Sequence, residues 1–479
     1  MAFFHGIKTS EIDTAVVATA QTTAGLPVVF GTAPVHLAEE PKINEPVICY
    51  SWSEAKKYLG YHEDWDKYTL CEPMYAEFKL FAVAPVVFIN VLDPAKHKKS
   101  VSSTSITVSR KSATINDDVI LSSLTVSATS AGSAAKAGTD YIAAYDDDGN
   151  TVISILEGGA LTDARNIYVA YDAVDVSLVK DADIIGGVGT NDAVTGMELI
   201  NYIYSRFSLV PGIIAAPGWS QHPEVAAVMR AKSRNINDVF RCSILTDIDT
   251  TEVKSYSGCN LWKSGNGYTG VAESVCWPMG KMGDHCYYMS TIEMGVIGQV
   301  DASNDDIPYE SPSNKSVPIT GLCLKDGTDV TLELTQANLL NSQGITTALN
   351  FGGGWRLWGN YTGAYPGSTD PKDTFLAVRR MFDWDDQVFI LTYWQRLDKP
   401  GVPRNIQIIL DSEQIRLNGL KSRGYILDGS VEFLEEENPT TDLEAGIFRF
   451  HKKRTPPIPM QEIDTISEYD VNAFNALFE

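Results

Sequence analysis

The sequence has none of the local motifs that reveal most large enzymes and nucleotide-driven motors. Its 479 residues contain no GxxxxGK(S/T) phosphate-binding loop and no HExxH zinc motif. Histidine occurs only seven times, and the pair Ser220 and His222 lacks a third residue that would complete a catalytic triad. We therefore predict no catalytic residues and no cofactor.

Metal-binding patterns are equally weak. Cys276, His285 and Cys286 are of ligand type, but three ligands separated by a wide gap match known zinc sites poorly. The acidic run Asp146 to Asp148 lacks the spacing of an EF-hand loop and favours a solvated turn. We predict no metal site.

Long apolar runs and disulfide patterns are also missing. No segment reaches the ~18 apolar residues of a membrane span, and residues 1–8 do not form a secretory signal. The seven cysteines are odd in number and widely spaced, with no CxxC motif. This usage favours reduced thiols in a protein made in the cytosol, so we expect neither membrane insertion nor export by a cleaved signal.

Basic charge is scarce. Lys and Arg number 38 against 61 Asp and Glu, which gives a formal net charge of −23. This balance argues against binding to nucleic acid or to an anionic membrane, because both need a basic surface. It is consistent with solubility, and also with mutual repulsion that keeps free subunits apart until a template gathers them.

Several domains are expected, because a single core rarely grows beyond about 250–300 residues. Buried strands are predicted near 26–33, 84–91, 211–218 and 240–247, with helical segments between them, and this alternation is typical of an α/β domain. Between them, residues 99–183 are rich in Ser, Thr and Val with period-two alternation, which predicts an inserted, outward-facing β domain. The middle α/β domain would then comprise 26–98 and 184–354.

The last compact unit is predicted over residues 355–459. Residues 375–396 read as one amphipathic helix, or as two helices broken near Asp383. Strands are expected at 404–410, 424–435 and 447–453, before a proline-rich stretch stops regular structure. Residues 1–25 and 460–479 have strand-like character but little core pattern, so both ends read as extended arms, and the chain as a multidomain protein of the α+β and α/β classes.

One block of sequence names a family. Residues 354–362, GWRLWGNYT, resemble the G-x-RLWGNRT signature of contractile-tail sheath proteins, which is the sheath family of myovirus-type phages and phage-tail-like particles. The signature residues here are Arg356, Leu357, Trp358, Gly359 and Asn360. Further segments resemble the family in the same order along the chain: 4–7, 29–34, 211–218, 311–314, 339–345, 375–380 and 417–426. Tyr361 departs from the family, which usually has Arg there.

The resemblance implies a structural subunit and not an enzyme. Such subunits form a homo-oligomer, a helical stack of hexameric rings around an inner tail tube protein, and the stack contracts to drive the tube through a bacterial envelope. Further implied partners are baseplate and tail terminator proteins. The implied location is a virion or phage-tail-like particle, assembled in the cytoplasm of the host bacterium, with the 355–459 domain facing the tube.

The resemblance also implies that terminal arms add strands to a neighbour's sheet. Arm candidates are Thr14, Val16, Val17, Ala18, Glu462, Ile463, Thr465 and Ile466. Candidates for the accepting strands are Tyr425, Leu427, Val431, Phe433, Phe448 and Phe450.

Lys372, Arg379 and Arg380 are candidates for contact with an acidic tube. For Arg379 the alternative is an ion pair with Asp383 at i,i+4.

Two other functions stay open. A tail-tube or baseplate protein is disfavoured by length, since tube proteins are usually smaller single-domain β proteins. A cell-wall hydrolase with the β-rich insert as a binding module would need a carboxylate pair or metal cluster, and neither is found in the sequence. Tubes seen by electron microscopy would favour the sheath.

Overall fold

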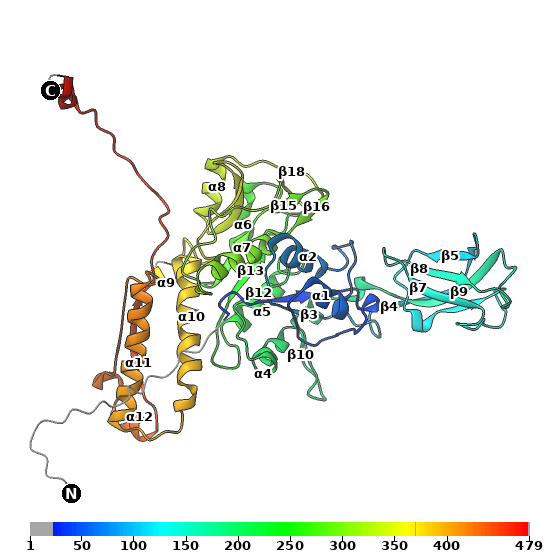
Figure 1. Ribbon diagram of the computed structural model, residues 1–479, viewed down its shortest axis with the longest axis horizontal. Helices are drawn as coiled ribbons and strands as arrows, with labels where there is room; N and C mark the ends of the chain where they lie inside the picture. The colour runs from blue at the N-terminus through cyan, green and yellow to red at the C-terminus, as the bar shows by residue number, and fades with distance from the viewer. Residues whose placement is uncertain (1–22, 369, 478–479) are drawn as a thin grey trace, which may run out of the picture.

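The computed structural model describes residues 23–368 and 370–477. Figure 1 shows a central α/β domain with a small β unit projecting from one end and a pair of long helices packed at the other. The predicted arm residues Thr14, Val16, Val17 and Ala18 lie outside the described residues. The chain is thus built from distinct layers of mixed α and β structure.

The central domain is organised around an eight-stranded sheet of order β2-β3-β1-β12-β13-β14-β19-β20. The six inner strands pair in parallel, and the two edge strands are antiparallel to their neighbours. Runs of β-branched and apolar residues form these strands because both faces of the sheet are covered. The strands are β1 (Pro27–Gly31), β2 (Val47–Cys49), β3 (Val86–Asn90), β12 (Ile213–Ala215), β13 (Ser243–Asp247), β14 (Glu273–Cys276), β19 (Ile345–Asn350) and β20 (Trp355–Trp358).

Helices cover this sheet, and most residues of α7 (Met289–Ser303) are buried. The others are α1 (Trp52–Leu59), α2 (Cys71–Tyr75), the π-helix η2 (Ala76–Phe81), α3 (Asp181–Ile185), α4 (Ile203–Phe207), α5 (Pro223–Ser233), α6 (Cys259–Gly265) and α8 (Leu334–Asn341). A four-stranded antiparallel sheet lies beside them: β15 (Met279–Met282), β16 (His285–Tyr287), β17 (Gly321–Cys323) and β18 (Asp329–Val330). A short hairpin joins β10 (Gly187–Val188) to β11 (Val194–Thr195).

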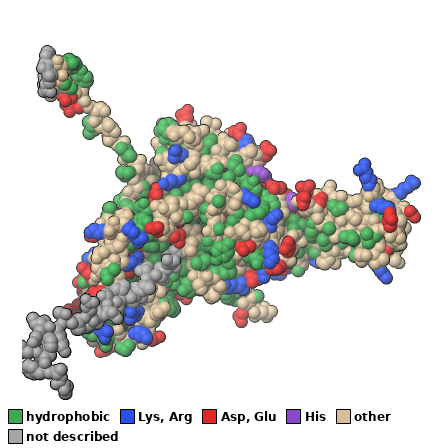
Figure 2. Space-filling model, in the orientation of Figure 1, with side chains coloured by type: hydrophobic (Ala, Val, Ile, Leu, Met, Phe, Trp, Pro, Cys, Tyr) green, Lys and Arg blue, Asp and Glu red, His purple; other side chains and the backbone are tan. Residues whose placement is uncertain are grey.

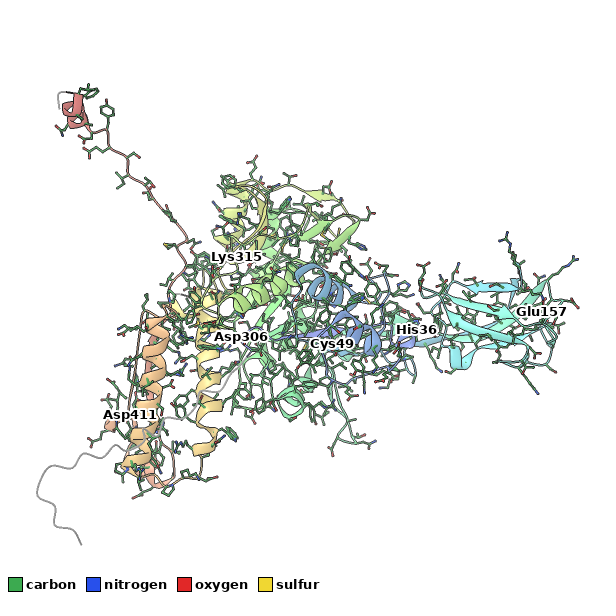
Figure 3. All side chains as sticks on the ribbon, in the orientation of Figure 1. His36, Cys49, Glu157, Asp306, Lys315 and Asp411 are labelled. Carbon is green, nitrogen blue, oxygen red and sulfur yellow. The ribbon has the colours of Figure 1, made fainter. Side chains whose placement is uncertain are left out.

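The β unit leaves the central domain after β3 and returns before α3. It consists of two three-stranded antiparallel sheets with a separate small core that includes Val126, Ile153 and Val169. The buried His36 side chain of the central domain lies near the base of the β unit (Figure 3). Its Nε2 is 3.7 Å from a carboxylate oxygen of Asp118, which belongs to the β unit. The strands are β4 (Lys98–Thr107), β5 (Ser112–Ile115), β6 (Thr125–Ser127), β7 (Tyr141–Tyr145), β8 (Thr151–Ile155) and β9 (Asn166–Val174).

The C-terminal part differs from the prediction in three ways. First, α10 (Leu376–Tyr393) is one helix that continues through Asp383 without a break. Second, residues 404–410 are not a strand but the start of α11 (Pro403–Ser422). Their Ile-rich run suggested a strand over seven residues, but Leu410, Leu417 and Leu420 continue it at helical spacing and pack into the core between the helices.

Third, β20 belongs to the central sheet. The boundary expected at 355 therefore divides a β19–β20 hairpin that pairs from Thr347–Trp358 to Asn350–Trp355. A two-stranded antiparallel sheet, β21 (Asp428–Glu432) with β22 (His451–Thr455), packs beside the long helices. Two short α-helices also lie here, α9 (Pro371–Thr374) and α12 (Thr440–Glu444).

The C-terminal tail leaves the body of the protein (Figure 1). Residues 456–470 form no helix or strand, although a strand-like start was expected at 461–466, and a 3-10 helix, η9 (Val471–Leu477), follows. Ile463 is 78% exposed and Ile466 is 93% exposed. Figure 2 shows hydrophobic and acidic side chains along this tail.

Candidate assembly surfaces

The β21–β22 sheet brings the predicted acceptor residues close to one another but not into one edge. Only Val431 lies in a strand; Tyr425 and Leu427 precede β21, Phe433 follows it, and Phe448 and Phe450 precede β22. The Phe433 ring lies 5.4 Å from that of Phe450 and 6.3 Å from that of Phe448. The three phenylalanines therefore form an aromatic cluster where the strands end, instead of lining a strand edge.

An ion-pair cluster fixes β22 to α10, and sequence analysis missed it. Asp385 of α10 is almost fully buried, and its Oδ2 lies 2.6 Å from the Lys452 Nζ and 2.9 Å from the Arg454 Nε. Arg416 of α11 contacts the other carboxylate oxygen. These cations hold the pKa of Asp385 well below its usual range, although burial opposes them. An acidic run at 383–386 and a basic run at 451–454 were the only sequence signal for this pairing.

Arg379 and Arg380 are buried, so their assignment to a tube contact is wrong. The Arg379 Nη2 lies 2.9 Å from an Asp383 oxygen, which is the i,i+4 pair that was the alternative. Arg380 pairs with Asp301 at the end of α7, at a side-chain exposure of 3%. The face of α10 that carries both arginines packs against the central domain. A buried guanidinium needs a carboxylate partner of this kind.

Lys372 stays partly exposed on the short helix α9. Its ammonium contacts Asp370, which is the N-cap of that helix, and lies 3.8 Å from an Asp373 oxygen. Of the three tube-contact candidates it is the one whose ammonium reaches the surface.

The family-signature residues join the central sheet to α10. Leu357 is buried, and Arg356 donates to the Asn314 carbonyl at 2.9 Å. The Asn360 carbonyl accepts from the Leu376 N–H at 2.9 Å, where α10 begins. Gly359 has φ 144° and passes close to the Thr346 backbone, where a Cβ would clash. These contacts all lie within the subunit.

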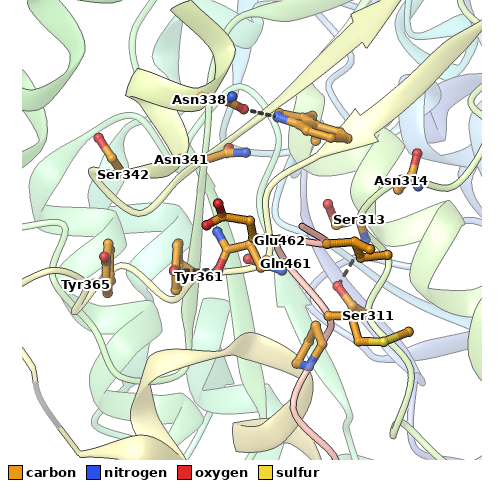
Figure 4. Close-up of a pocket in the computed structure, with 15 residues that line it drawn as sticks. Ser311, Ser313, Asn314, Asn338, Asn341, Ser342, Tyr361, Tyr365, Gln461 and Glu462 are labelled. Carbon is orange, nitrogen blue, oxygen red and sulfur yellow. Dashed lines mark hydrogen bonds between the residues drawn. The ribbon is translucent and has the colours of Figure 1, made fainter. Parts of the chain in front are cut away.

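A groove of about 880 Å³ lies between these residues and the root of the tail (Figure 4). Tyr361 stacks on Tyr365 with 3.8 Å between ring centroids and on Phe375 with 5.0 Å. Its hydroxyl donates to the Gln461 side-chain oxygen at 2.5 Å. The residue that departs from the family signature thus contacts the tail where it leaves the body.

The cysteines and histidine considered as metal ligands have other contacts. The Cys276 thiol is buried and donates to Glu293 at 3.1 Å, while the His285 ring stacks on Trp65 at 4.3 Å. Over residues 23–368 and 370–477 there is no group of three or more His, Cys, Asp or Glu placed to hold a metal ion. Within the same ranges, no helix has the length and apolar character to cross a membrane.

Comparison with known proteins finds similarity along the whole chain. It is 26% identical over 480 residues to the tail sheath protein of Burkholderia phage BcepMu, covering 98% of each chain. It is 25% identical over 289 residues to the tail sheath protein of Escherichia phage P2, covering 59% of this chain and 69% of that protein. No family model matches the chain.

Solved structures show the same fold. A chain of the PVC sheath complex, an extracellular contractile injection system in its contracted state, aligns with a TM-score of 0.58 at 12% identity over 99% of each chain. A chain of the contracted anti-feeding prophage baseplate aligns with a TM-score of 0.59 at 11% identity, over 98% of this chain and 99% of that one. The resemblance to contractile-tail sheath proteins that the motifs indicated is confirmed.

Proposed function

We propose that this protein is the sheath subunit of a contractile tail, which polymerises helically around an inner tail tube and shortens to drive the tube through a bacterial envelope. The observation that carries the proposal is the tail at 456–470, which leaves the body with Ile463 and Ile466 exposed, in a chain similar over 98% of its length to a tail sheath protein. Apolar side chains exposed on an extended segment mark an interaction site.

The subunits are linked by strand exchange in this proposal. An extended tail that adds to a neighbour's sheet forms main-chain hydrogen bonds. About six such bonds at ~0.5–1.5 kcal/mol each would hold neighbours together while weaker side contacts rearrange. An interface of this head-to-tail kind does not close on itself and so builds a filament.

The remaining partners follow from the same proposal. The part formed by α9 to β22 faces the tube, with Lys372 as its exposed cation, and baseplate and tail terminator proteins contact the two ends of the sheath. The β unit projects outward. Assembly takes place in the bacterial cytoplasm, in a virion or a tail-like particle.

Truncation and electron microscopy test the proposal. The full chain should form tubes or long polysheaths, while variants lacking residues 1–20 or 461–479 should be folded and soluble but should not polymerise. Circular dichroism and thermal unfolding check that the truncated chains are folded. If either truncated chain builds sheath-like tubes, the linkage by arms is refuted.

A proline substitution tests the strand exchange itself. Ile463→Pro removes one backbone donor and fixes φ, whereas the matched control Ile463→Ala removes a similar apolar side chain and keeps the backbone. The tail is exposed, so neither change should alter the unfolding of the body. Ile463→Pro should reduce polymer yield by about tenfold or more relative to Ile463→Ala, as loss of ~1.4 kcal/mol implies. Equal yields would contradict a main-chain linkage.

A further inference from the structure

Basic side chains of the β unit are divided between its two ends. At the base, the ammonium groups of Lys98 and Lys99 pair with Asp172 at 2.6 Å and with Asp117 at 3.3 Å. The other Lys and Arg residues of 98–174 lie in loops at the distal end, away from the central domain: Arg110, Lys111, Lys136 and Arg165. Figure 2 shows Lys and Arg side chains at this end. Positive charge therefore gathers at one place on a chain whose net charge is −23.

Strand pairing brings these loops together. Strands β4 and β9 are antiparallel with Thr107 opposite Asn166, so the turn after β4 lies beside the loop before β9. Ser127, the last residue of β6, is opposite Tyr168 of β9, which places the loop after β6 at the same end. Three loops that are separate in the sequence thus form one surface at the distal end.

The carboxylates in these loops leave most of the basic charge free. Asp140 accepts from two backbone donors, the Lys136 N–H at 2.7 Å and the Ala160 N–H at 2.8 Å, which fixes two of the loops to each other. Lys111 pairs with Glu157 at 2.6 Å. Three exposed cations have no ion pair within the part of the chain that the structure describes: Arg110, Lys136 and Arg165.

A groove of about 480 Å³ lies among the same loops. Its volume is in the range of sites that hold small molecules or a few sugar units. Tyr168 lies on the outer face of its sheet, because its neighbours Ile167 and Val169 are buried and side chains alternate along a strand. The side chains that line the groove include those of Thr129, Thr162, Asp163, Arg165, Asn166 and Tyr168.

These side chains suit a ligand that carries both hydroxyl groups and carboxylates. The threonine hydroxyls, the Asn166 amide and the Asp163 carboxylate can exchange hydrogen bonds with sugar hydroxyls. The Arg165 guanidinium can bind a carboxylate through two parallel N–H donors. Nucleic acid fits poorly, because it needs a longer run of cations along its phosphates, and Asp163 lies in the groove itself.

We infer that the distal end of the β unit binds an acidic polysaccharide, with Arg165 contacting a sugar carboxylate and Asn166 contacting sugar hydroxyls. The groove lies within a single subunit, so this binding goes beyond the proposed sheath function and does not depend on assembly. Arg110 and Lys136 add attraction for further carboxylates along the polymer.

Binding of defined polymers to the full chain tests the inference. The probe is a fluorescent alginate oligosaccharide, which is made only of carboxylate-bearing sugars, and binding is followed by fluorescence anisotropy at about 0.15 M salt. Dextran of the same length provides the sugar hydroxyls without the charge. Polyglutamate of the same length provides the carboxylates without the sugar. Alginate should bind at least tenfold more tightly than dextran and several-fold more tightly than polyglutamate.

Substitutions in the groove should separate charge from sugar recognition. Arg165→Gln should weaken alginate binding about tenfold, because a charge-assisted contact is lost. The matched control is Arg404→Gln, which makes the same change at an exposed arginine on α11 and should leave binding unaltered. Asn166→Ala should weaken alginate binding several-fold and leave polyglutamate binding unchanged. These side chains are exposed, and thermal unfolding checks that each variant is folded.

Each outcome bears on the inference separately from the proposed function. Absence of alginate binding, equal affinity for alginate and dextran, or equal affinity for alginate and polyglutamate overturns the inference. Equal affinities of Arg165→Gln and Arg404→Gln for alginate overturn it too. Arg165→Gln should still form tubes like the unmodified chain, whereas failure of the unmodified chain to form tubes would overturn the proposed function and leave the binding site standing.

Discussion

Replacing Asp385 by Asn should destabilise the C-terminal part of the protein strongly. This carboxylate is 2% exposed and contacts three cationic side chains: Arg416, Lys452 and Arg454. Without its charge, the cations stay buried with fewer partners, and loss of one member of a buried ion pair typically costs about 3–5 kcal/mol. The lower end applies here, because Glu413 still lies 2.6 Å from Arg416 and 3.4 Å from Lys452.

The assay is denaturant unfolding combined with hydrogen exchange of the β22 amides. Asp385→Asn should lower the free energy of unfolding by about 3 kcal/mol and speed exchange in β22, which is tied to α10 through this residue. The matched control is Asp386→Asn, whose carboxylate is 38% exposed and pairs with Arg454 at 2.6 Å. Its loss should cost about 1 kcal/mol or less. Equal costs for the two variants, or unchanged exchange in β22, would refute this account of the cluster.

The difference in free energy of unfolding between the wild-type protein and Asp385→Asn should depend on pH in one direction. The folded pKa of Asp385 is lowered from its ordinary value of 3.8. A lowered folded pKa gives stability that is fully present above the unfolded pKa and is lost as the pH falls through the folded pKa. The difference in free energy of unfolding between the wild-type protein and Asp385→Asn should therefore persist at pH 5 to 8 and decrease only in stronger acid.

Three further results are expected. Glu77 is fully buried, its carboxylate has no hydrogen-bond partner among the described residues, and burial raises its pKa well above 4.5. The free energy of unfolding should therefore fall as the pH rises above the unfolded pKa of this group. In thermal unfolding scans, Glu77→Gln should reduce this fall and stabilise the protein at pH 8. Identical pH slopes would contradict this. Tyr361→Phe should leave the melting temperature unchanged but speed proteolysis within 456–470, because the tail loses its contact with the Tyr361 hydroxyl; unchanged proteolysis would count against that contact. Arg380→Ala should lower the free energy of unfolding in urea by about 3–5 kcal/mol, because it leaves Asp301 buried and unpaired. Lys372→Ala should change that free energy by about 0.5 kcal/mol or less. Similar losses for the two variants would contradict the difference in burial.

The mixed α and β character of the chain could be predicted from the sequence because it depends on local pattern. Period-two alternation with few core residues marked the β unit, and apolar strand runs separated by helical segments marked the central domain. The family resemblance could also be found from local pattern, because the signature residues 356–360 are adjacent in the sequence. Local pattern gave the wrong prediction at 404–410. A strand was predicted there from seven residues that belong to a helix of 20 residues.

What only the tertiary structure decided concerns partners that are distant in the chain. Arg380 looked like a surface cation on an amphipathic helix, but Asp301 lies 79 residues away in sequence and buries it. The charge cluster at Asp385 joins α10, α11 and β22, which lie apart in the sequence. The sequence by itself determined the mixed α and β character of the chain and its family resemblance; the packing of the elements determined which charges are buried, because burial is a property of contacts between segments.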